Sequence, residues 1–416
     1  MSRRVSVLVT GSELVRGARR DANGPFLADE LTRLGLEPAR ITLVGDDAER
    51  LEEAIREGLD GDLLVISGGL GPTHDDRTVE LLARAAGLEA PVDEGLAQEI
   101  EAISRAIAKR FDRPYAEFEA GVRKQATVPA GGRVIGIAGT APGLVVETEG
   151  AVAIVLPGPP PELRRLWRAA LEDEAVRRVV GGVEAPERHV LRTYGVSESA
   201  VARALVEAGG EPAGVEATIC AHDGEIWAEL FGPAAALAST LKVALGPAVF
   251  AEDDRPVEEL VLDLVREQGL TLGAAESCTG GLVAARLTSV PGASDVFRGG
   301  VVAYENDVKL APLGVAQETL AAHGAVSAET AAAMAEGART SLRTDVAVAV
   351  TGIAGPGGGT PEKPVGLVHL CAAGPGRELA RELHLPGDRE AIRRRATAAA
   401  LHLLRELLAQ SRHTSA

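Results

Sequence analysis

The sequence is poor in cysteine and in aromatic residues. Its three cysteines, Cys220, Cys278 and Cys371, are far apart and form no C-x-x-C pair. This spacing argues against a disulfide framework and against a structural zinc site, and it fits a reducing compartment, so we expect a cytoplasmic protein. Aromatic residues make up only 3% of the 416 residues, so the cores must be built from Val, Leu, Ile and Ala.

Long apolar runs and an excess of positive charge are also missing. No run approaches the ~20 apolar residues of a membrane span, and the apolar stretch before Glu13 is too short for a signal peptide. We therefore expect no membrane contact. The net charge is −17, and a field of this sign repels phosphate backbones, so extended nucleic-acid binding is not expected. Small anionic substrates remain compatible, because they respond to the local charges of a pocket.

The length predicts two or three domains. In the N-terminal part, short β-branched runs alternate with helical stretches, which predicts an α/β domain with a parallel sheet covered on both faces. Ligands of such sheets bind outside the carboxyl ends of the strands. The expected strands are Val5–Thr10, Arg40–Val44, Asp62–Ser67 and Val152–Leu156, and the expected helices are Asn23–Leu34, Ala48–Leu59, Arg77–Ala86 and Glu162–Arg178.

A smaller module follows, with a predicted β-α-β-β-α order. Its expected elements are His189–Tyr194, Ser197–Ala208, Val215–Cys220, Glu225–Phe231 and Ala234–Ala244. This order is compatible with a nucleic-acid-binding KH module, but acidic residues outnumber basic ones and no basic G-x-x-G loop is present. The composition favours a connector or dimerisation module.

The first chemical pattern is a glycine-rich loop with acidic pairs at two strand ends. Glycines allow backbone N–H groups to approach a diphosphate, and the following helix N-terminus favours negative charge. The carboxylates are hard oxygen ligands suited to a divalent cation. Alternatively, Asp46 and Asp76 cap the helices that follow them. The residues of this pattern are Gly68, Gly69, Gly71, Asp46, Asp47, Asp75 and Asp76.

The second pattern places Ser277 directly after the predicted strand Leu270–Ala275 and before a helix that begins at Leu282. A serine on such a turn is exposed, and the N–H groups around Thr279 and Gly280 are candidate oxyanion donors. Cys278 is a rival nucleophile by residue type. Lys309 is a candidate base, since burial lowers the pKa of a lysine and Ser–Lys pairs are known nucleophile–base pairs, although most lone lysines are solvated.

Two further segments are candidate ligand-binding regions. The loop Thr351–Gly359 follows a predicted strand and is rich in glycine and proline, which indicates close approach of the backbone to a ligand or, alternatively, a mobile turn. Arg389 and Arg393 are one helical turn apart and can hold a phosphate, or else form a solvated face.

The motifs of the whole chain together resemble the competence/damage-inducible protein CinA family. The matching segments are GSELVRGARRDAN (11–23), LVGDD (43–47), GGLGPTHDD (68–76), LPGPPPEL (156–163), AESCTGG (275–281), YENDVK (304–309), GAVSAETAAAMAEGA (324–338), TGIAGPGGGTPEKPVG (351–366) and PGDREAIR (386–393). Small departures are Ser12, Glu305 and Thr360-Pro361, and none removes a presumed catalytic group.

The resemblance implies a three-domain α/β protein. Residues 1–175 would form a molybdopterin-binding-like domain that hydrolyses ADP-ribose to AMP and ribose 5-phosphate with Mg²⁺, Mn²⁺ or Co²⁺. Residues 176–252 would form a KH-like connector. Residues 256–416 would deamidate nicotinamide mononucleotide without a cofactor. A homodimer and contact with a recombinase are further expectations by family association. The alternatives are a non-enzymatic competence or DNA-repair adaptor and a molybdopterin-binding protein.

The resemblance also assigns roles to residues. Ser277 would be the nucleophile and Lys309 its base, with Tyr304 in the same pocket. The oxyanion would be bound by the backbone of Thr279, Gly280 and Gly281. The metal would be held by Asp46, Asp47, Asp75 and Asp76. Substrate-binding residues would be Thr351, Gly352, Gly355, Gly357, Arg389 and Arg393 in the amidase domain, and Gly68, Gly69, Gly71, Thr73, Glu13 and Asn23 in the N-terminal domain.

Overall fold

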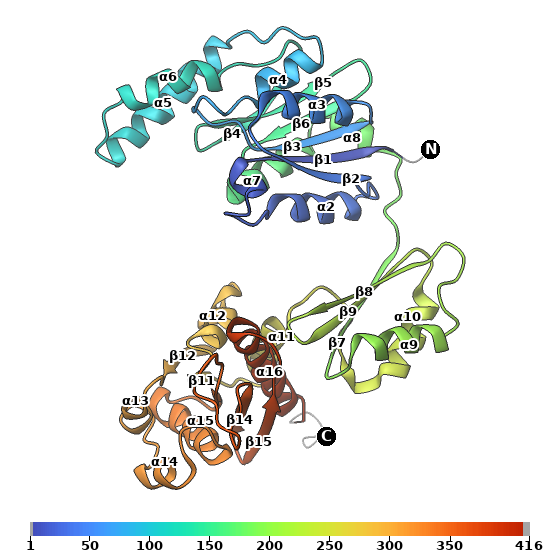
Figure 1. Ribbon diagram of the computed structural model, residues 1–416. Helices are drawn as coiled ribbons and strands as arrows, with labels where there is room; N and C mark the ends of the chain where they lie inside the picture. The colour runs from blue at the N-terminus through green and yellow to red at the C-terminus, as the bar shows by residue number, and fades with distance from the viewer. Residues whose placement is uncertain (1–2, 411–416) are drawn as a thin grey trace. The chain divides into compact units, whose positions relative to one another are not determined.

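The computed structural model describes residues 3–410, which form two compact units with a boundary between Pro186 and Glu187 (Figure 1). Each unit is described by itself. The predicted fold class is confirmed, because sheets and helices are mixed in both units. The predicted division into three domains stays a prediction; contacts group the middle module with the C-terminal part.

The first unit contains a six-stranded sheet with strand order β2-β1-β3-β6-β5-β4. The first four strands of this order are parallel, and β5 and β4 are antiparallel to their neighbours. The strands are β1 (Val5–Thr10), β2 (Arg40–Val44), β3 (Leu63–Ser67), β4 (Arg133–Ala138), β5 (Ala141–Glu147) and β6 (Val152–Leu156). The predicted parallel sheet is thus correct for four strands and wrong for two that the apolar pattern did not reveal.

Helices cover both faces of this sheet (Figure 1). Val5, Val7 and Val9 of β1 pack on one face with α2, α7 and α8, while Leu8 packs on the other with α3 to α6, as the alternation of side chains along a strand requires. The helices are α1 (Ser12–Val15), α2 (Asn23–Arg33), α3 (Ala48–Leu59), α4 (Thr78–Ala85), α5 (Glu94–Arg110), α6 (Ala116–Gln125), α7 (Pro160–Ala170) and α8 (Glu174–Val180).

The single helix predicted over Glu162–Arg178 is two helices, α7 and α8. The interruption has a local cause: the Asp173 side chain accepts a hydrogen bond from the Ala175 N–H at 2.9 Å and caps α8. Aspartate is a favoured N-cap because its carboxylate satisfies a free amide of the first turn.

The second unit begins with a four-stranded antiparallel sheet of order β10-β7-β9-β8, packed against α9 and α10. The predicted β-α-β-β-α order is present, and a short strand, β10, joins the sheet. The elements are β7 (Arg188–Tyr194), α9 (Glu198–Glu207), β8 (Glu216–His222), β9 (Glu225–Phe231), α10 (Ala235–Leu245), the 3-10 turn η1 (Gly246–Ala248) and β10 (Val249–Ala251).

The C-terminal part contains a five-stranded sheet of order β12-β11-β13-β14-β15, with α11, α12 and α16 on one face and α15 on the other. Its strands are β11 (Leu272–Glu276), β12 (Phe297–Val302), β13 (Val346–Gly352), β14 (Leu367–Gly374) and β15 (Arg377–His384). Its helices are α11 (Val257–Glu267), α12 (Leu282–Ser289), η2 (Ala293–Asp295), α13 (Asn306–Leu310), α14 (Gln317–His323), α15 (Ala328–Leu342) and α16 (Arg389–Gln410).

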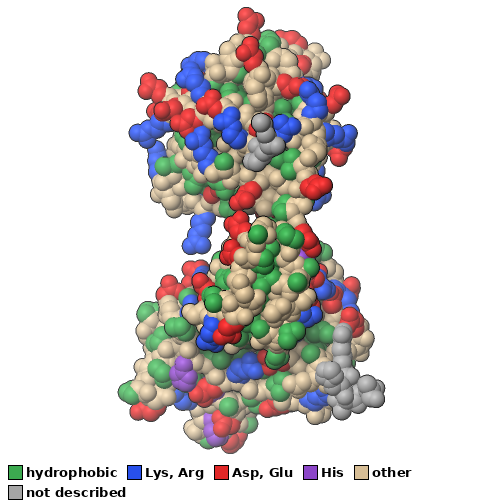
Figure 2. Space-filling view, turned by 90° about the vertical axis from the view of Figure 1, so that its right-hand side faces the viewer, with side chains coloured by type: hydrophobic (Ala, Val, Ile, Leu, Met, Phe, Trp, Pro, Cys, Tyr) green, Lys and Arg blue, Asp and Glu red, His purple; other side chains and the backbone are tan. Residues whose placement is uncertain are grey.

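No helix within residues 3–410 is both long enough and apolar enough to cross a membrane. On the face shown in Figure 2, acidic and basic side chains are interspersed over the described surface. The expected lack of nucleic-acid partners stays a prediction.

Candidate active sites

Ser277 lies in the turn between β11 and α12, at the carboxyl end of a central strand. Its N–H donates to Val350 O of the neighbouring strand β13 at 2.8 Å, which fixes the turn to the sheet. The side chain is largely buried, so the predicted exposure of this serine is wrong. The predicted strand-to-turn-to-helix placement is confirmed.

The structure brings Lys309 of α13 to Ser277. Lys309 Nζ lies 3.2 Å from Ser277 Oγ, 2.7 Å from Ala303 O and 3.4 Å from Tyr304 O. The lysine is only 1% exposed, and burial lowers its pKa despite the opposing influence of Glu305. In the neutral amine, two N–H groups suffice for the two carbonyl oxygens, so the lone pair can face the serine hydroxyl. This arrangement suits a general base.

Cys278, the rival nucleophile, is placed differently. Its side chain is 5% exposed and belongs to the apolar cluster between the sheet and α16. Burial raises the pKa of the thiol to about 11, so the reactive thiolate is scarce at neutral pH. The geometry favours Ser277.

Glu276, which sequence analysis did not single out, organises the turn. Its carboxylate is 1% exposed and accepts hydrogen bonds from the N–H groups of Gly281, Val283 and Ala284 at 2.9, 3.0 and 2.9 Å. A carboxylate at a helix N-terminus is stabilised by these amides and by the helix dipole. Glu276 therefore holds the start of α12 beside the serine. Its position directly before Ser277 was the only available sequence signal.

These three hydrogen bonds, which we call the Glu276 clasp, show that part of the predicted oxyanion site is wrong. The Gly281 N–H is occupied by Glu276, and the Gly280 N–H donates to Ser277 O at 3.1 Å. Neither amide is free for a substrate oxygen in this conformation. Of the described residues of the turn, Cys278 and Thr279 remain as candidate backbone donors.

We expect the substitution Glu276→Gln to lower the free energy of unfolding by about 1–3 kcal/mol, because an amide group cannot accept all three hydrogen bonds in the buried site. Urea unfolding of the full chain measures this effect. Glu329→Gln, at the exposed first turn of α15, is the matched control and should change stability by less than about 0.5 kcal/mol. Equal effects of the two substitutions would contradict the clasp.

Tyr304 and Arg389 lie beside the serine–lysine pair. One Arg389 Nη donates to the Tyr304 hydroxyl at 2.6 Å, and the other donates to Gly355 O at 2.6 Å. Tyr304 is 54% exposed. The predicted pocket residues from the β12–α13 connection, the glycine loop and α16 are thus in direct contact.

Arg393 donates hydrogen bonds to the backbone of the turn that carries Ser277. Its Nε donates to Cys278 O at 3.1 Å and its Nη2 donates to Thr279 O at 2.7 Å. Because these donors are engaged by the backbone, the structure shows a role for Arg393 in positioning the turn. Binding of phosphate by Arg393 stays a prediction.

At the end of β13, which includes Thr351 and Gly352, and in the loop after it, most of the predicted residues pack against protein. The buried Thr351 hydroxyl donates to Ala325 O at 2.6 Å. A Cβ atom at Gly352 would overlap Leu367 O, and one at Gly355 would overlap Val365, whereas Gly357 faces open space. Close backbone packing therefore explains Gly352 and Gly355 without a ligand.

A second candidate site lies at the carboxyl ends of β1, β3 and β6 in the first unit. A cavity of about 690 Å³ contains the predicted residues Glu13 and Asn23 together with Arg19 and Arg20. Asn23 is buried and donates to Ser67 Oγ and Gly158 O at 2.9 and 2.7 Å, while its Oδ1 has no partner among the described residues. The two arginines supply positive charge that the sequence analysis missed in the motif around Glu13.

Gly69, Gly71 and Asp76 line a smaller cavity of about 200 Å³ with Lys124. The glycines of this loop pack against protein: a Cβ atom at Gly68 would collide with Thr10 O, and one at Gly71 with the Asp76 carboxylate. Gly68 also has a φ of 106°, which only glycine adopts without strain. Tight loop packing thus accounts for Gly68, and the contact of the three glycines with a diphosphate stays a prediction.

The four predicted metal-binding carboxylates are not gathered in one cluster. The two acidic pairs follow β2 and β3, and strand β1 lies between these strands, so the pairs do not stand at adjacent strand ends. Asp46 accepts from Ser12 N at 2.9 Å, and Asp47 caps α3 by accepting from Arg50 N at 3.1 Å. The predicted caps at Asp46 and Asp76 are therefore wrong: Asp47 caps α3, and no described side chain caps α4.

Asp75 and Asp76 lie together around Thr73. The Thr73 hydroxyl contacts Asp75 Oδ1 and lies 2.5 Å from Asp76 Oδ2, and the Thr73 N–H donates to Asp76 at 2.9 Å. Within residues 3–410, no three His, Cys, Asp or Glu side chains are grouped as metal ligands. Two carboxylates are nevertheless enough for a cation whose other ligands are water and substrate phosphate, as is common for Mg²⁺.

Two family models match the chain, one within each of its two compact units. Residues 254–408 match the model of the CinA C-terminal domain, and residues 6–176 match that of the probable molybdopterin binding domain. A CinA-like protein of Mycolicibacterium paratuberculosis is 45% identical and covers 98% of this chain and 99% of its own length. A CinA-like protein of Mycobacterium tuberculosis is 44% identical, with 98% of each chain covered.

Among solved structures, the competence/damage inducible protein CihA of Agrobacterium tumefaciens is 45% identical, with a TM-score of 0.36, and the match covers 38% of this chain and 99% of that one. The full-length similarity to curated relatives decides the family. The chain belongs to the CinA family and combines a molybdopterin-binding-type N-terminal domain with a CinA C-terminal domain.

Proposed function

We propose that the C-terminal part deamidates nicotinamide mononucleotide to nicotinic acid mononucleotide and ammonia. The observation that carries the proposal is the contact between the buried Lys309 Nζ and Ser277 Oγ, at 3.2 Å. A serine next to a desolvated lysine, at the carboxyl end of a central strand, is a nucleophile–base pair suited to acyl transfer.

In the proposed reaction, Ser277 Oγ attacks the carboxamide carbon while Lys309 Nζ takes the hydroxyl proton. The oxyanion is stabilised by the backbone amides of Cys278 and Thr279. Lys309 then returns the proton to the departing nitrogen, and the C–N bond breaks to release ammonia. In the second half, water attacks the ester, Lys309 takes a proton from it, and Ser277 is restored as the acid leaves.

The site contains candidate groups for the rest of the substrate. Arg389 is exposed at the start of α16 and contacts Tyr304, so exchanging one of its present partners for the ribose phosphate gives a charge-assisted pair. Gly357, which faces open space in the neighbouring loop, allows the substrate to approach the backbone. This step requires no metal.

For the N-terminal domain, we propose hydrolysis of ADP-ribose to AMP and ribose 5-phosphate. The cavity with Arg19 and Arg20 is large enough for a nucleotide and provides cations for the diphosphate. Asp75 and Asp76 would hold a divalent cation, Mg²⁺, Mn²⁺ or Co²⁺, which would polarise the phosphoryl oxygens. Lys124, beside Asp76, adds positive charge at the same loop.

One assay of the pure full-length protein tests both proposals. The protein is incubated with each substrate, with added Mn²⁺ or with EDTA, and ammonia and AMP are measured. Ammonia from the mononucleotide in both conditions, and AMP from ADP-ribose only with metal, are the expected results. No ammonia under either condition would refute the amidase proposal.

The metal proposal predicts a specific effect of the carboxylate pair. We expect Asp75→Asn/Asp76→Asn to lower AMP formation by about a hundredfold, because a polarising cation supplies several kcal/mol to the reaction. Deamidation should be unchanged. The matched control is Asp47→Asn, since an amide still caps α3. AMP formation that persists in EDTA would contradict the role of the metal.

A further inference from the structure

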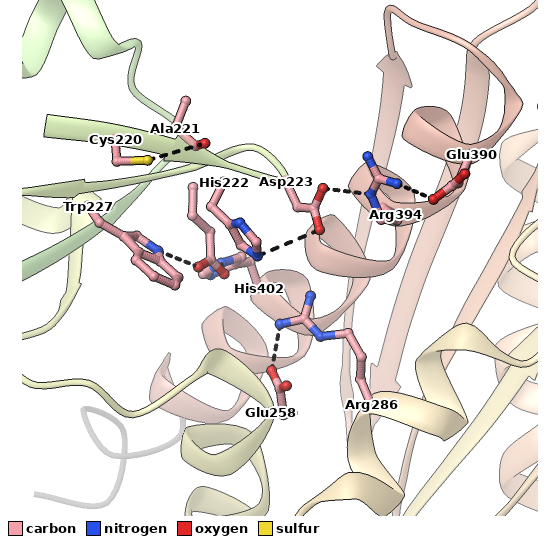
Figure 3. A network of polar contacts seen from close by, with 11 residues as sticks. Cys220, Ala221, His222, Asp223, Trp227, Glu258, Arg286, Glu390, Arg394 and His402 are labelled. Carbon is pink, nitrogen blue, oxygen red and sulfur yellow. Dashed lines mark hydrogen bonds and ion pairs between the residues drawn. The ribbon is translucent and has the colours of Figure 1, made fainter. Parts of the chain in front are cut away.

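A third cavity, of about 420 Å³, lies within the second unit, where the four-stranded sheet meets α12 and α16. Its volume falls in the range of small-molecule sites, ~300–1,000 Å³. Figure 3 shows part of its polar wall. The lining residues used below are Arg192, His222, Trp227, Pro256, Leu282 and Arg286.

Most charged groups around this cavity are neutralised by neighbours. Asp223 pairs with Arg394 at 2.9 Å, and Glu258 pairs with Arg286 at 2.6 Å (Figure 3). Glu225 contacts the buried His402 at 2.9 Å. Asp254 likewise pairs with Arg188 at 2.7 Å. Asp223, Glu258 and Asp254 are therefore paired with arginines. Glu225 instead faces the imidazole of His402, and because burial lowers the pKa of that imidazole, the contact does not cancel the negative charge of Glu225.

Among the arginines that line the cavity, Arg192 is the exception. It is 7% exposed, and its Nε has no hydrogen-bond partner among the described residues. One Nη donates to Arg255 O at 3.4 Å, and the guanidinium carbon lies 4.1 Å from the centre of the Trp227 ring. The residues described here include no carboxylate in ion-pair contact with Arg192. Since arginine stays protonated, a buried guanidinium without a carboxylate in direct contact loses part of its solvation, although Glu225 and Asp254 stabilise its charge from a distance.

We propose that this cavity binds a small aromatic monocarboxylate. The ligand carboxylate would pair with the Arg192 guanidinium, whose planar fork matches a carboxylate. The ring would contact Pro256, Leu282 and the imidazole of His222, which lies 5.0 Å from the Trp227 ring centre. An arginine already stacked on an aromatic face is preorganised for such a pair.

The charges of the residues that line the cavity favour a ligand with a single negative charge. A phosphate or a dicarboxylate would meet one unpaired cation, but also the carboxylates of Asp223, Glu225 and Glu258, which lie around the same space. Arg286 and Arg394 would have to leave their present partners to neutralise more charge. A neutral ligand would not form the charge-assisted pair with the Arg192 guanidinium.

Two helices, α12 and α16, connect the cavity to the proposed amidase site. An effect of the ligand on deamidation therefore rests on the proposed function. Leu282 and Arg286 belong to α12, whose start is held by Glu276 next to Ser277. On α16, Arg394 follows Arg393, which binds the carbonyl oxygens of the serine turn. A ligand wedged against both helices would shift the turn and change the rate of deamidation.

The binding test uses benzoate as the probe and the full-length protein, with isothermal titration calorimetry as the readout. We expect saturable binding of one benzoate per chain, and at least about tenfold weaker binding of the isosteric neutral molecule benzamide, since a charge-assisted pair is lost. Arg192→Met should weaken benzoate binding by a similar factor. Arg203→Met, on the exposed face of α9, is the matched control and should bind like the wild type.

Two outcomes would overturn the proposal: no binding of millimolar benzoate by the wild type, or equal binding by wild type and Arg192→Met. If Arg192→Met does not fold, His222→Ala tests the proposal instead. The His222 side chain is exposed on the hairpin, and its only proposed role is to line the cavity. We expect this variant to bind benzoate several-fold more weakly than the wild type. Saturating benzoate should also change kcat or KM for deamidation in the wild type. Binding of benzoate does not require deamidation, so the binding result can be interpreted even if the protein has no amidase activity.

Discussion

Replacing Ser277 by alanine is expected to lower the rate of nicotinamide mononucleotide deamidation by at least about 10⁴-fold, since loss of a nucleophile that forms a covalent intermediate removes the catalysed pathway. The fold should persist, because the Ser277 backbone, which donates to Val350 O, is unchanged. Ammonia release under saturating substrate measures the effect. Hydrolysis of ADP-ribose by the same sample serves as an internal control for folding of the other unit.

The neighbouring thiol provides the matched variant. Cys278→Ala removes the rival nucleophile next to Ser277 but leaves the Lys309 contact in place. We expect this variant to keep most of the activity, because the thiol is buried and its pKa is raised to about 11. If Cys278→Ala abolished deamidation and Ser277→Ala did not, the assignment of the nucleophile would be wrong.

The sequence predicted the fold best where hydrophobic patterns are regular. The strands β1, β2 and β6 have the predicted bounds. For β1 and β6 the reason is burial, since continuous apolar runs are typical of buried parallel strands. It failed at β4 and β5, whose residues Gly136 and Gly143 interrupt the apolar pattern and pack below α7, against Leu166. Such partners are distant in the sequence, so a local pattern does not reveal them.

The candidate sites show the same contrast. The proximity of Ser277 to Lys309 required the resemblance, since nothing in a local window connects residues from β11 and α13. The clasp formed by Glu276 could not be predicted, because a buried carboxylate is unusual and its partners are backbone amides. The four aspartates were grouped wrongly because the order of strands β2-β1-β3 is a property of the sheet.

Lys309→Met is expected to lower deamidation by about 10³-fold, the usual magnitude for a general acid–base group. Met preserves the length of the apolar stem, so the buried space beside Ala303 stays filled. The control is Lys242→Met, which removes an exposed lysine paired with Glu252. If Lys309→Met kept the full rate of deamidation, Lys309 would be excluded as the base.

The pH dependence provides an independent test of Lys309. A base must be unprotonated, so kcat/KM should rise with pH through the pKa of Lys309, which burial places below the value of an exposed lysine, about 10.4. In the same window, between the lowered pKa and about 10.4, the unfolded chain binds more protons than the folded one. The free energy of unfolding of the wild type should therefore increase with pH relative to Lys309→Met. A rise in activity without this change in relative stability would assign the titration to another group.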